Sequence, residues 1–216
     1  MTPPAPLSIL AILEAVSLTG PAKNLLQFAE SVGPGTPEST RVQLRLVTYR
    51  RPGQSETNDF LTAASRLGLA CEIIHETSAL DFRTLPQIRA LVERFQPDVI
   101  QTHNVKSAFL LRLSGVYRRT PWIHWHHGYT APTGKQVLYN QLDRFSVRRA
   151  KQIVTVTSAF IPELLGIGIP RERIEVIPNA IRADWGALPA DVSKAIVRRR
   201  GERPDWRRGS GLSGRI

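Results

Sequence analysis

The sequence predicts a doubly wound, Rossmann-like α/β fold with a mainly parallel sheet. Along residues 1–182, about seven short apolar runs alternate with segments whose apolar residues follow helical spacing. The 216 residues are 42% hydrophobic and 22% charged, which is typical of a globular domain with a substantial core. No internal repeat is present. Disordered, fibrous and disulfide-scaffold classes are therefore excluded.

The apolar run 7–18 predicts the first strand, buried on both faces of the sheet. The tripeptide Thr-Gly-Pro at 19–21 ends this run, and helical spacing begins at Lys23 and stops before Gly33. The same alternation continues to residue 177. It predicts strands at 42–49, 70–75, 98–102, 122–126, 153–157 and 174–177, and helices at 58–67, 85–95, 106–117, 136–150 and 161–165.

The net charge of +11 is unevenly distributed. Residues 194–216 hold eight basic and two acidic side chains, so the rest of the chain carries only +5. With so modest a charge and no helix-turn-helix pattern, we expect no nucleic-acid partner. The single cysteine, Cys71, allows no internal disulfide and predicts a buried thiol. The segment before the first apolar run has no basic residue, and that run is too short to span a bilayer, so we expect a cytoplasmic protein.

In a doubly wound sheet, the ligand crevice lies beyond the carboxyl ends of the strands. The first candidate there is the loop TGPAKN, with Gly20, Lys23 and Asn24. It lacks both the dinucleotide fingerprint and the phosphate loop. Gly20 offers a tight turn into a helix N-terminus, which favours an anionic or hydroxyl-rich ligand, and Lys23 is a candidate charged contact. The alternative is a simple turn glycine beside a solvated lysine.

Histidines follow two other strands. Strand alternation places His124 and His126 on one sheet face, in the packing layer under the helices. No carboxylate lies near them in the sequence, so we expect no metal site. His127, directly before Gly128, is placed to enter the crevice, where an imidazole can orient sugar hydroxyls or stabilise developing charge. Analogous candidates follow other strands, namely His103, Asn104 and Ser158, and the alternative is that such residues are satisfied polar groups.

The predicted helix 136–150 has a basic stripe opposite the apolar residues Leu138, Leu142 and Phe145, which we expect to face inward. Such a stripe is usually a solvated face. The alternative is contact with anionic lipid or a phosphorylated acceptor. The residues of the stripe are Gln141, Arg144, Arg148 and Lys151.

Five segments in order and register resemble the amino-terminal domain of family 4 glycosyltransferases of the GT-B fold. They are TGPAKNLLQFAE, FQPDVIQTHNVKS, PWIHWHHGYT, LDRFSVRRAKQIVTVTSAF and IEVIPNAI, and the resemblance covers about residues 7–182. It implies a retaining enzyme that needs no metal or other cofactor. Such an enzyme moves a sugar from a nucleotide-sugar donor to a glycan or lipid-linked acceptor held mainly by this domain. A peripheral contact with the inner face of an anionic membrane follows for a lipid-linked acceptor.

The resemblance also implies roles for particular residues. His127 matches the family's strand-end histidine, which contacts the donor sugar near the reacting carbon. Gly20 matches the glycine-rich first loop, although Pro21 replaces the usual second glycine. Asn179 matches the Asn of the hinge between domains, and Ala180 stands where glycine is common. The other matching positions, all assigned to substrate binding, are His103, Asn104, Gly128 and Ser158.

Residues 183–216 predict a linker and a basic tail, whereas a GT-B enzyme continues into a second domain that binds the donor nucleotide. An Arg/Gly-rich tail in place of an apolar strand is typical of a frameshifted or truncated product. Within this tail, Arg215 matches the arginine that meets the donor diphosphate. We therefore expect the acceptor-side half of a transferase, inactive alone. The alternative is a non-catalytic module that binds a sugar, nucleotide or phospholipid, or that pairs with a separate donor domain.

Overall fold

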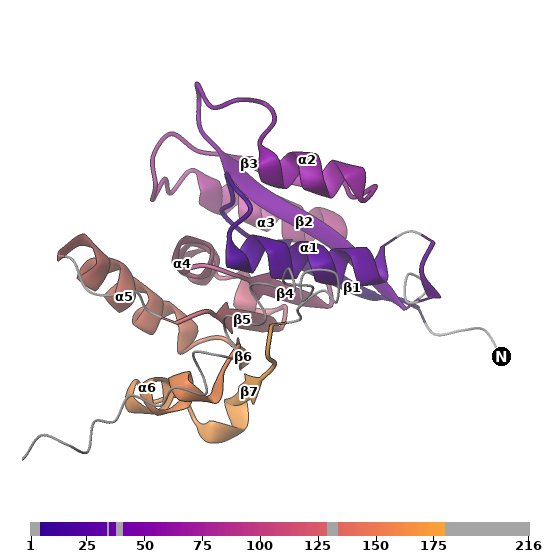
Figure 1. The fold of residues 1–216 in the computed structure, drawn as a ribbon. Helices are drawn as coiled ribbons and strands as arrows, with labels where there is room; N and C mark the ends of the chain where they lie inside the picture. Colours follow the sequence, from indigo (N-terminus) through magenta and orange to yellow (C-terminus); the bar gives the residue numbers. More distant parts are fainter. Residues whose placement is uncertain (1–4, 34, 38–40, 129–133, 180–216) are drawn as a thin grey trace, which may run out of the picture. The chain divides into compact units, whose positions relative to one another are not determined.

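The computed structural model describes residues 5–33, 35–37, 41–128 and 134–179 (Figure 1). Within them the chain forms a seven-stranded parallel sheet with helices on both faces, which confirms the predicted fold class. The compact unit extends to Asn179. The predicted tail 183–216, with Arg215, lies outside the described residues.

All seven predicted strands form, and all but the first have boundaries close to the expected ones. The strands are β1 (Leu7–Ile12), β2 (Val42–Arg50), β3 (Cys71–His75), β4 (Val99–Thr102), β5 (Trp122–His126), β6 (Gln152–Thr155) and β7 (Ile174–Val176). The helices are α1 (Gly20–Val32), α2 (Asp59–Arg66), α3 (Thr84–Phe95), α4 (Val105–Ser114), α5 (Gly134–Val147) and α6 (Ile161–Gly166).

The strand order is β3-β2-β1-β4-β5-β6-β7. β1 is an inner strand, and its last residue, Ile12, pairs with Val47 of β2 on one side and Thr102 of β4 on the other. The chain therefore builds the sheet outward from β1 in one direction and then, from β4 onward, in the other. Such a switch point leaves a crevice beyond the carboxyl ends of the two diverging strands.

Two apolar cores cover the two faces of the sheet. On one face α1 and α2 pack on β1 and β2, and on the other the helices from α3 to α6 pack on the sheet. Burial of apolar surface stabilises a fold by about 25 cal/mol per Å². The two cores therefore hold the strands in place, including the strand ends that carry the site. The first core includes Leu13, Leu25, Leu46 and Phe60, and the second includes Ile12, Ile88, Ile100, Leu110, Trp122, Ile153 and Leu164.

The first strand is shorter than its apolar run predicts. β1 ends at Ile12, whereas Val16 and Leu18 are 55% and 38% exposed. Ladder pairing stops here because Ala15 N–H donates to the side-chain Oγ1 of Thr48, 3.3 Å away, rather than to the backbone of β2. Residues 16–19 thus form a surface loop at the carboxyl edge, and Gly20 is the first residue of α1.

Helix α5 presents a different face from the predicted one. Leu138 and Phe145 are 59% and 44% exposed, so the expectation that they point inward is wrong. The buried face instead carries Asp143, Ser146 and Val147. Asp143 lies toward two buried histidines of β5, with carboxylate oxygens 3.7 and 3.8 Å from their ring nitrogens.

Cys71 is half-buried on β3 rather than fully buried. Burial, assisted by the charge of Glu72, raises the pKa of its thiol to about 12. The thiol is therefore protonated and unreactive at neutral pH.

Candidate functional site

The predicted site residues gather at the carboxyl edge of the sheet, around the switch point. β4 is followed by His103 and β5 by His127, while the first turn of α1 brings Asn24 to the same region. The side-chain amide of Asn24 donates to Oδ1 of Asn179, 2.5 Å away, although 155 positions separate the two residues. The edge thus joins residues from the two ends of the described chain.

Three aromatic rings line this edge on the face covered by α1. The ring of His103 stacks on Trp125, with centroids 5.7 Å apart and planes at 13°. The ring of His127 also lies near His103, with centroids 6.4 Å apart and planes at 26°. The stack forms because alternate residues of β5 point to the same face as the residue that follows β4.

A cavity of about 90 Å³, which we call the histidine pocket, opens beside this stack. His103 is only 4% exposed, yet neither of its ring nitrogens has a hydrogen-bond partner among the described residues. Within the same residues, Nε2 of His127 and Nε1 of Trp125 are also unpartnered. Buried polar atoms normally have partners, so this pocket is suited to a polar ligand. It is lined by Asn24, Leu25, Phe28, Gln101, His103 and Trp125.

Both histidines of the stack are neutral at physiological pH. Burial holds the pKa of His103 well below its usual value, and the nearby His127 and His124 lower it further. Burial likewise lowers the pKa of His127 to about 4. A neutral imidazole offers one donor and one acceptor, a combination that matches a sugar hydroxyl.

The predicted residues of the first turn remain accessible. A Cβ added to Gly20 would meet nothing within 4 Å, so the space in front of this turn is open. The side chain of Thr19, at the N-cap, makes no capping hydrogen bond, and Lys23 is exposed. The N-terminus of α1 therefore faces open space, and the binding of a ligand at this turn stays a prediction.

Asn104 is held by the protein itself. Its Oδ1 accepts from the N–H of Ser107, 2.9 Å away, which caps α4, and its amide donates to the backbone oxygen of Glu14 at 3.2 Å. Its side chain thus positions the loop after β1. Ser158, in contrast, is exposed at the start of a short 3-10 turn after β6.

Gly128 is required by packing. Its φ of +85° is disfavoured for other residues, and a Cβ there would lie 2.2 Å from the ring of Phe160. The ring of Phe160 also meets His126 edge-on, with centroids 5.4 Å apart. Gly128 therefore leaves room for the ring of Phe160 against the backbone just after His127.

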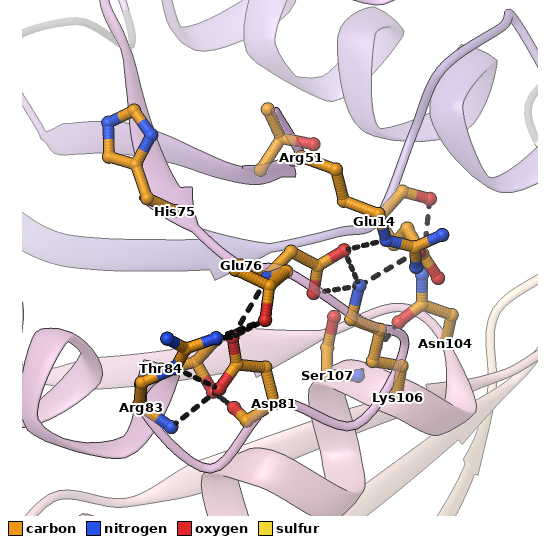
Figure 2. Close-up of polar contacts among 12 residues, drawn as sticks. Glu14, Arg51, His75, Glu76, Asp81, Arg83, Thr84, Asn104, Lys106 and Ser107 are labelled. Atoms are coloured by element: carbon orange, nitrogen blue, oxygen red, sulfur yellow. Dashed lines mark hydrogen bonds and ion pairs between the residues drawn. The ribbon is translucent and has the colours of Figure 1, made fainter. Parts of the chain in front are cut away.

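A buried ionic cluster, not found from the sequence, lies just beyond the carboxyl ends of β1, β2 and β3 (Figure 2). The ammonium of Lys106 is 2.8 Å from Oε1 of Glu14 and 2.6 Å from Oε1 of Glu76. Arg51 donates through Nε to Glu76 at 2.9 Å and lies 3.4 Å from Glu14. Lys106 and Glu76 are 3% or less exposed, and the ammonium sits 4.2 Å from the centre of the Tyr49 ring. Two cations thus balance two carboxylates.

This cluster ties together the loops that follow β1, β2 and β3, and connects them to α4. Beside it an open cleft of about 470 Å³ lies at the ends of β2 and β3. The cleft holds a second ion pair, in which Arg83 binds Asp81 at 2.9 Å and holds the pKa of that carboxyl well below its usual value. Its lining includes Arg50, Arg51, Glu56, His75, Glu76 and Gln87. The only sequence signal was Glu14, a lone charge in the first apolar run.

The basic stripe of α5 is partly used inside the fold. Arg144 pairs with Glu163 of α6 at 3.4 Å, and Nε of Arg148 donates to the backbone oxygen of Ile167 at 3.0 Å. These contacts hold α6 against α5. None of the described helices is both long and apolar enough to cross a membrane.

The comparisons agree with this architecture. Residues 39–185 match the family described as Glycosyltransferase Family 4. HepE of Anabaena in complex with UDP superposes with a TM-score of 0.64 at 14% identity, over 90% of this chain and 50% of HepE. The lipopolysaccharide outer core galactosyltransferase WaaB superposes with a TM-score of 0.60 at 12% identity, over 81% of this chain and 46% of WaaB. UDP-GlcNAc 2-epimerase of Neisseria meningitidis, bound to UDP-GlcNAc, superposes with a TM-score of 0.57 at 12% identity. The superposition covers 80% of this chain and 47% of the epimerase.

The chain spans about half the length of these solved structures, and at such identities the likeness is one of fold. A comparison with curated protein sequences finds no match. The family match, however, covers more than half of the chain, and it includes β2 to β7 with both strand-end histidines. The chain therefore belongs to glycosyltransferase family 4, with the fold of the amino-terminal domain of a GT-B enzyme.

Proposed function

We propose that this chain forms the acceptor-side half of a retaining glycosyltransferase. It would move a sugar from a nucleotide-sugar donor to a glycan or lipid-linked acceptor, on the cytoplasmic side of a membrane. One observation carries the proposal: two neutral imidazoles, the buried His103 and the half-buried His127, stand at the carboxyl edge of β4 and β5 with ring nitrogens that have no partner among the described residues. Support for the donor class comes from HepE, a similar fold solved with UDP and with UDP-glucose.

In this proposal the chain's own residues bind and orient the donor sugar and the acceptor, and they form no covalent bond with either. His127 hydrogen-bonds a hydroxyl of the donor sugar as the bond from its anomeric carbon to the diphosphate breaks. The acceptor hydroxyl forms the new bond on the same face of the sugar, and its proton leaves with the diphosphate. The neutral ring of His103 packs against His127 and adds no charge to the site. The open turn at Gly20 leaves room for the donor phosphates.

The donor contacts require residues beyond this half. The solved structures that the chain matches are about twice as long, so we expect the 216 residues alone to release no nucleoside diphosphate above background. The test incubates the chain with nucleotide sugars and acceptors, alone and together with the donor-binding half of a family 4 enzyme. Release only in the second case supports the proposal. Robust turnover by the chain alone would overturn it.

The same assay distinguishes sugar transfer from two other functions, epimerisation of a nucleotide sugar and binding without chemistry. Similar structures include UDP-N-acetylglucosamine 2-epimerases, so C2 inversion of UDP-GlcNAc is measured in parallel. Epimerisation without sugar transfer would replace the transferase by an epimerase. Binding of a saccharide or nucleotide with no chemistry in either mixture would favour a binding module.

A further inference from the structure

Beneath α5, on the sheet face opposite the histidine pocket, two histidines and one carboxylate converge. His124 and His126 are alternate residues of β5, so both side chains point to the same face. Asp143 reaches them from α5, far along the chain. All three side chains are 2–3% exposed. The fold thus supplies the carboxylate whose absence near the histidines in sequence argued against a metal site.

The distances between these groups suit ligands of one ion. Nε2 of His124 is 3.7 Å from Oδ1 of Asp143, and Nδ1 of His126 is 3.8 Å from Oδ2. Both distances are too long for direct hydrogen bonds between the groups. Two ligands bound tetrahedrally at about 2.0–2.1 Å lie about 3.4 Å apart, so each of the two histidine–aspartate distances is within a few tenths of an ångström of that value. One ligand atom from each residue lies within 4.8 Å of the others.

The residues around the cluster hold His124 in an orientation suited to coordination. Nε1 of Trp122 donates to Oγ1 of Thr102 at 2.8 Å, and this hydroxyl lies 3.0 Å from Nδ1 of His124. When Nδ1 carries the proton and donates it to Thr102, the lone pair of Nε2 faces Asp143. Such an outer hydrogen bond is what fixes the ring of a metal-binding histidine.

We propose that His124, His126 and Asp143 bind one Zn²⁺-class divalent ion that ties α5 to β5. Two imidazole nitrogens and one carboxylate oxygen favour a transition metal over Mg²⁺ or Ca²⁺, which prefer oxygen ligands alone. The ion lies on the far face of β5 from the histidine pocket, so its role is structural. It fixes the end of the strand whose next residue is His127. The expectation that sugar transfer needs no metal concerns the reaction, which this ion does not touch.

The test uses the purified chain after removal of metals with a chelator and dialysis. We expect one Zn²⁺ per chain by elemental analysis, and a melting temperature about 5–10 °C higher at a Zn²⁺ concentration 100-fold above its Kd. Mg²⁺ at the same concentration should give no shift. Asp143→Asn, which keeps the shape of the side chain, should abolish both effects. His75→Gln removes an exposed histidine and should change neither.

A measurement on the unaltered chain covers the case in which Asp143→Asn does not fold. X-ray absorption of the Zn²⁺-loaded protein should show two imidazoles and oxygen ligands in a low-coordinate shell. A shell containing sulfur from Cys71, or oxygen ligands alone, would overturn the proposal. So would a wild-type chain that binds no Zn²⁺, or binding that Asp143→Asn retains and His75→Gln removes.

Discussion

His103 stacks on Trp125 with ring planes at 13°, and both ring nitrogens of His103 are unpartnered among the described residues. His103 comes directly after β4 and Trp125 lies in the neighbouring parallel strand β5. Both residues line the histidine pocket. A buried polar ring without partners destabilises the fold by about 1–3 kcal/mol. Such an arrangement at the switch point of the sheet is typical of a binding site, where a ligand supplies the missing hydrogen bonds.

The first prediction concerns the buried ionic cluster. Lys106→Met removes the buried cation between Glu14 and Glu76 and leaves only Arg51, which is 34% exposed, to balance two carboxylates, of which Glu76 is almost fully buried. We expect the free energy of unfolding to fall by about 3–5 kcal/mol. Urea denaturation measures the change.

The control is the surface pair in which Arg94 binds Glu72, with side chains 56% and 28% exposed. Arg94→Met should lower stability by less than about 1 kcal/mol. Equal losses in the two variants would show that the cluster at Lys106 is no more important than a surface ion pair.

The second prediction concerns Gly128. An alanine here adopts an unfavourable positive φ and places its Cβ against the ring of Phe160, so we expect a loss of about 2–4 kcal/mol. Gly53→Ala is the matched control, because its φ is +79° but its Cβ would meet nothing within 4 Å. It should lose only about 1–2 kcal/mol. Thermal melts are measured for both variants and for the double variant Gly128→Ala with Phe160→Leu. The double variant should regain part of the stability that Gly128→Ala loses. If it regains none, the contact with Phe160 is not the cause of the loss.

The third prediction is a pH dependence that comes from His103. Its pKa lies below 6.5 in the folded state, so the unfolded chain binds the proton more readily. Its contribution to stability is therefore full above about pH 6.5 and decreases on acidification, by up to about 1.4 kcal/mol per pH unit.

The matched variant is His103→Phe, which keeps a ring on Trp125 but cannot titrate. Between pH 7 and 5 its stability should decrease less steeply than that of the wild type, while His75→Asn, at an exposed position, should leave the wild-type slope unchanged. Parallel slopes for wild type and His103→Phe would place the titrating group elsewhere.

The fourth prediction concerns the exposed apolar residues of α5. For a lipid-linked acceptor, we expect the chain to co-sediment with anionic vesicles at low salt and to detach as salt rises, because each surface cation contributes only about 1 kcal/mol. Leu138→Ser with Phe145→Ser should weaken this binding, since both side chains are exposed. Deleting residues 194–216 separates the basic tail from the helix. Complete loss with the deletion and no effect of the serines would remove α5 as a membrane contact.

The sequence predicted the strands well because each strand is a short segment rich in apolar and β-branched residues between helical patterns. It did not predict where β1 ends, since Ala15 leaves the ladder for the hydroxyl of Thr48, a tertiary contact that no local pattern encodes. The ionic cluster was missed for a similar reason. Lys106 meets Glu14 and Glu76 from 92 and 30 positions away, and only the sheet order brings them together.

The candidate site was predicted in part. Strand alternation correctly separated buried His124 and His126 from His127, and the carboxyl-edge rule placed His103 and Asn24 near each other. The rotation of α5 was not predicted, because the helix buries the polar residues Asp143 and Ser146 and exposes Leu138 and Phe145, the reverse of the usual amphipathic pattern.

The most direct test of the account is the turnover of His127→Ala in the chain combined with the donor-binding half of a family 4 enzyme. Nucleoside diphosphate release should fall by about 10²-fold or more, as for other single positioned hydrogen-bond donors, while the melting temperature stays near that of the wild type. His75→Ala is the control and should keep its rate. A His127→Ala protein that melts normally and turns over at nearly the wild-type rate would contradict the assignment of the reaction site to this edge of the sheet.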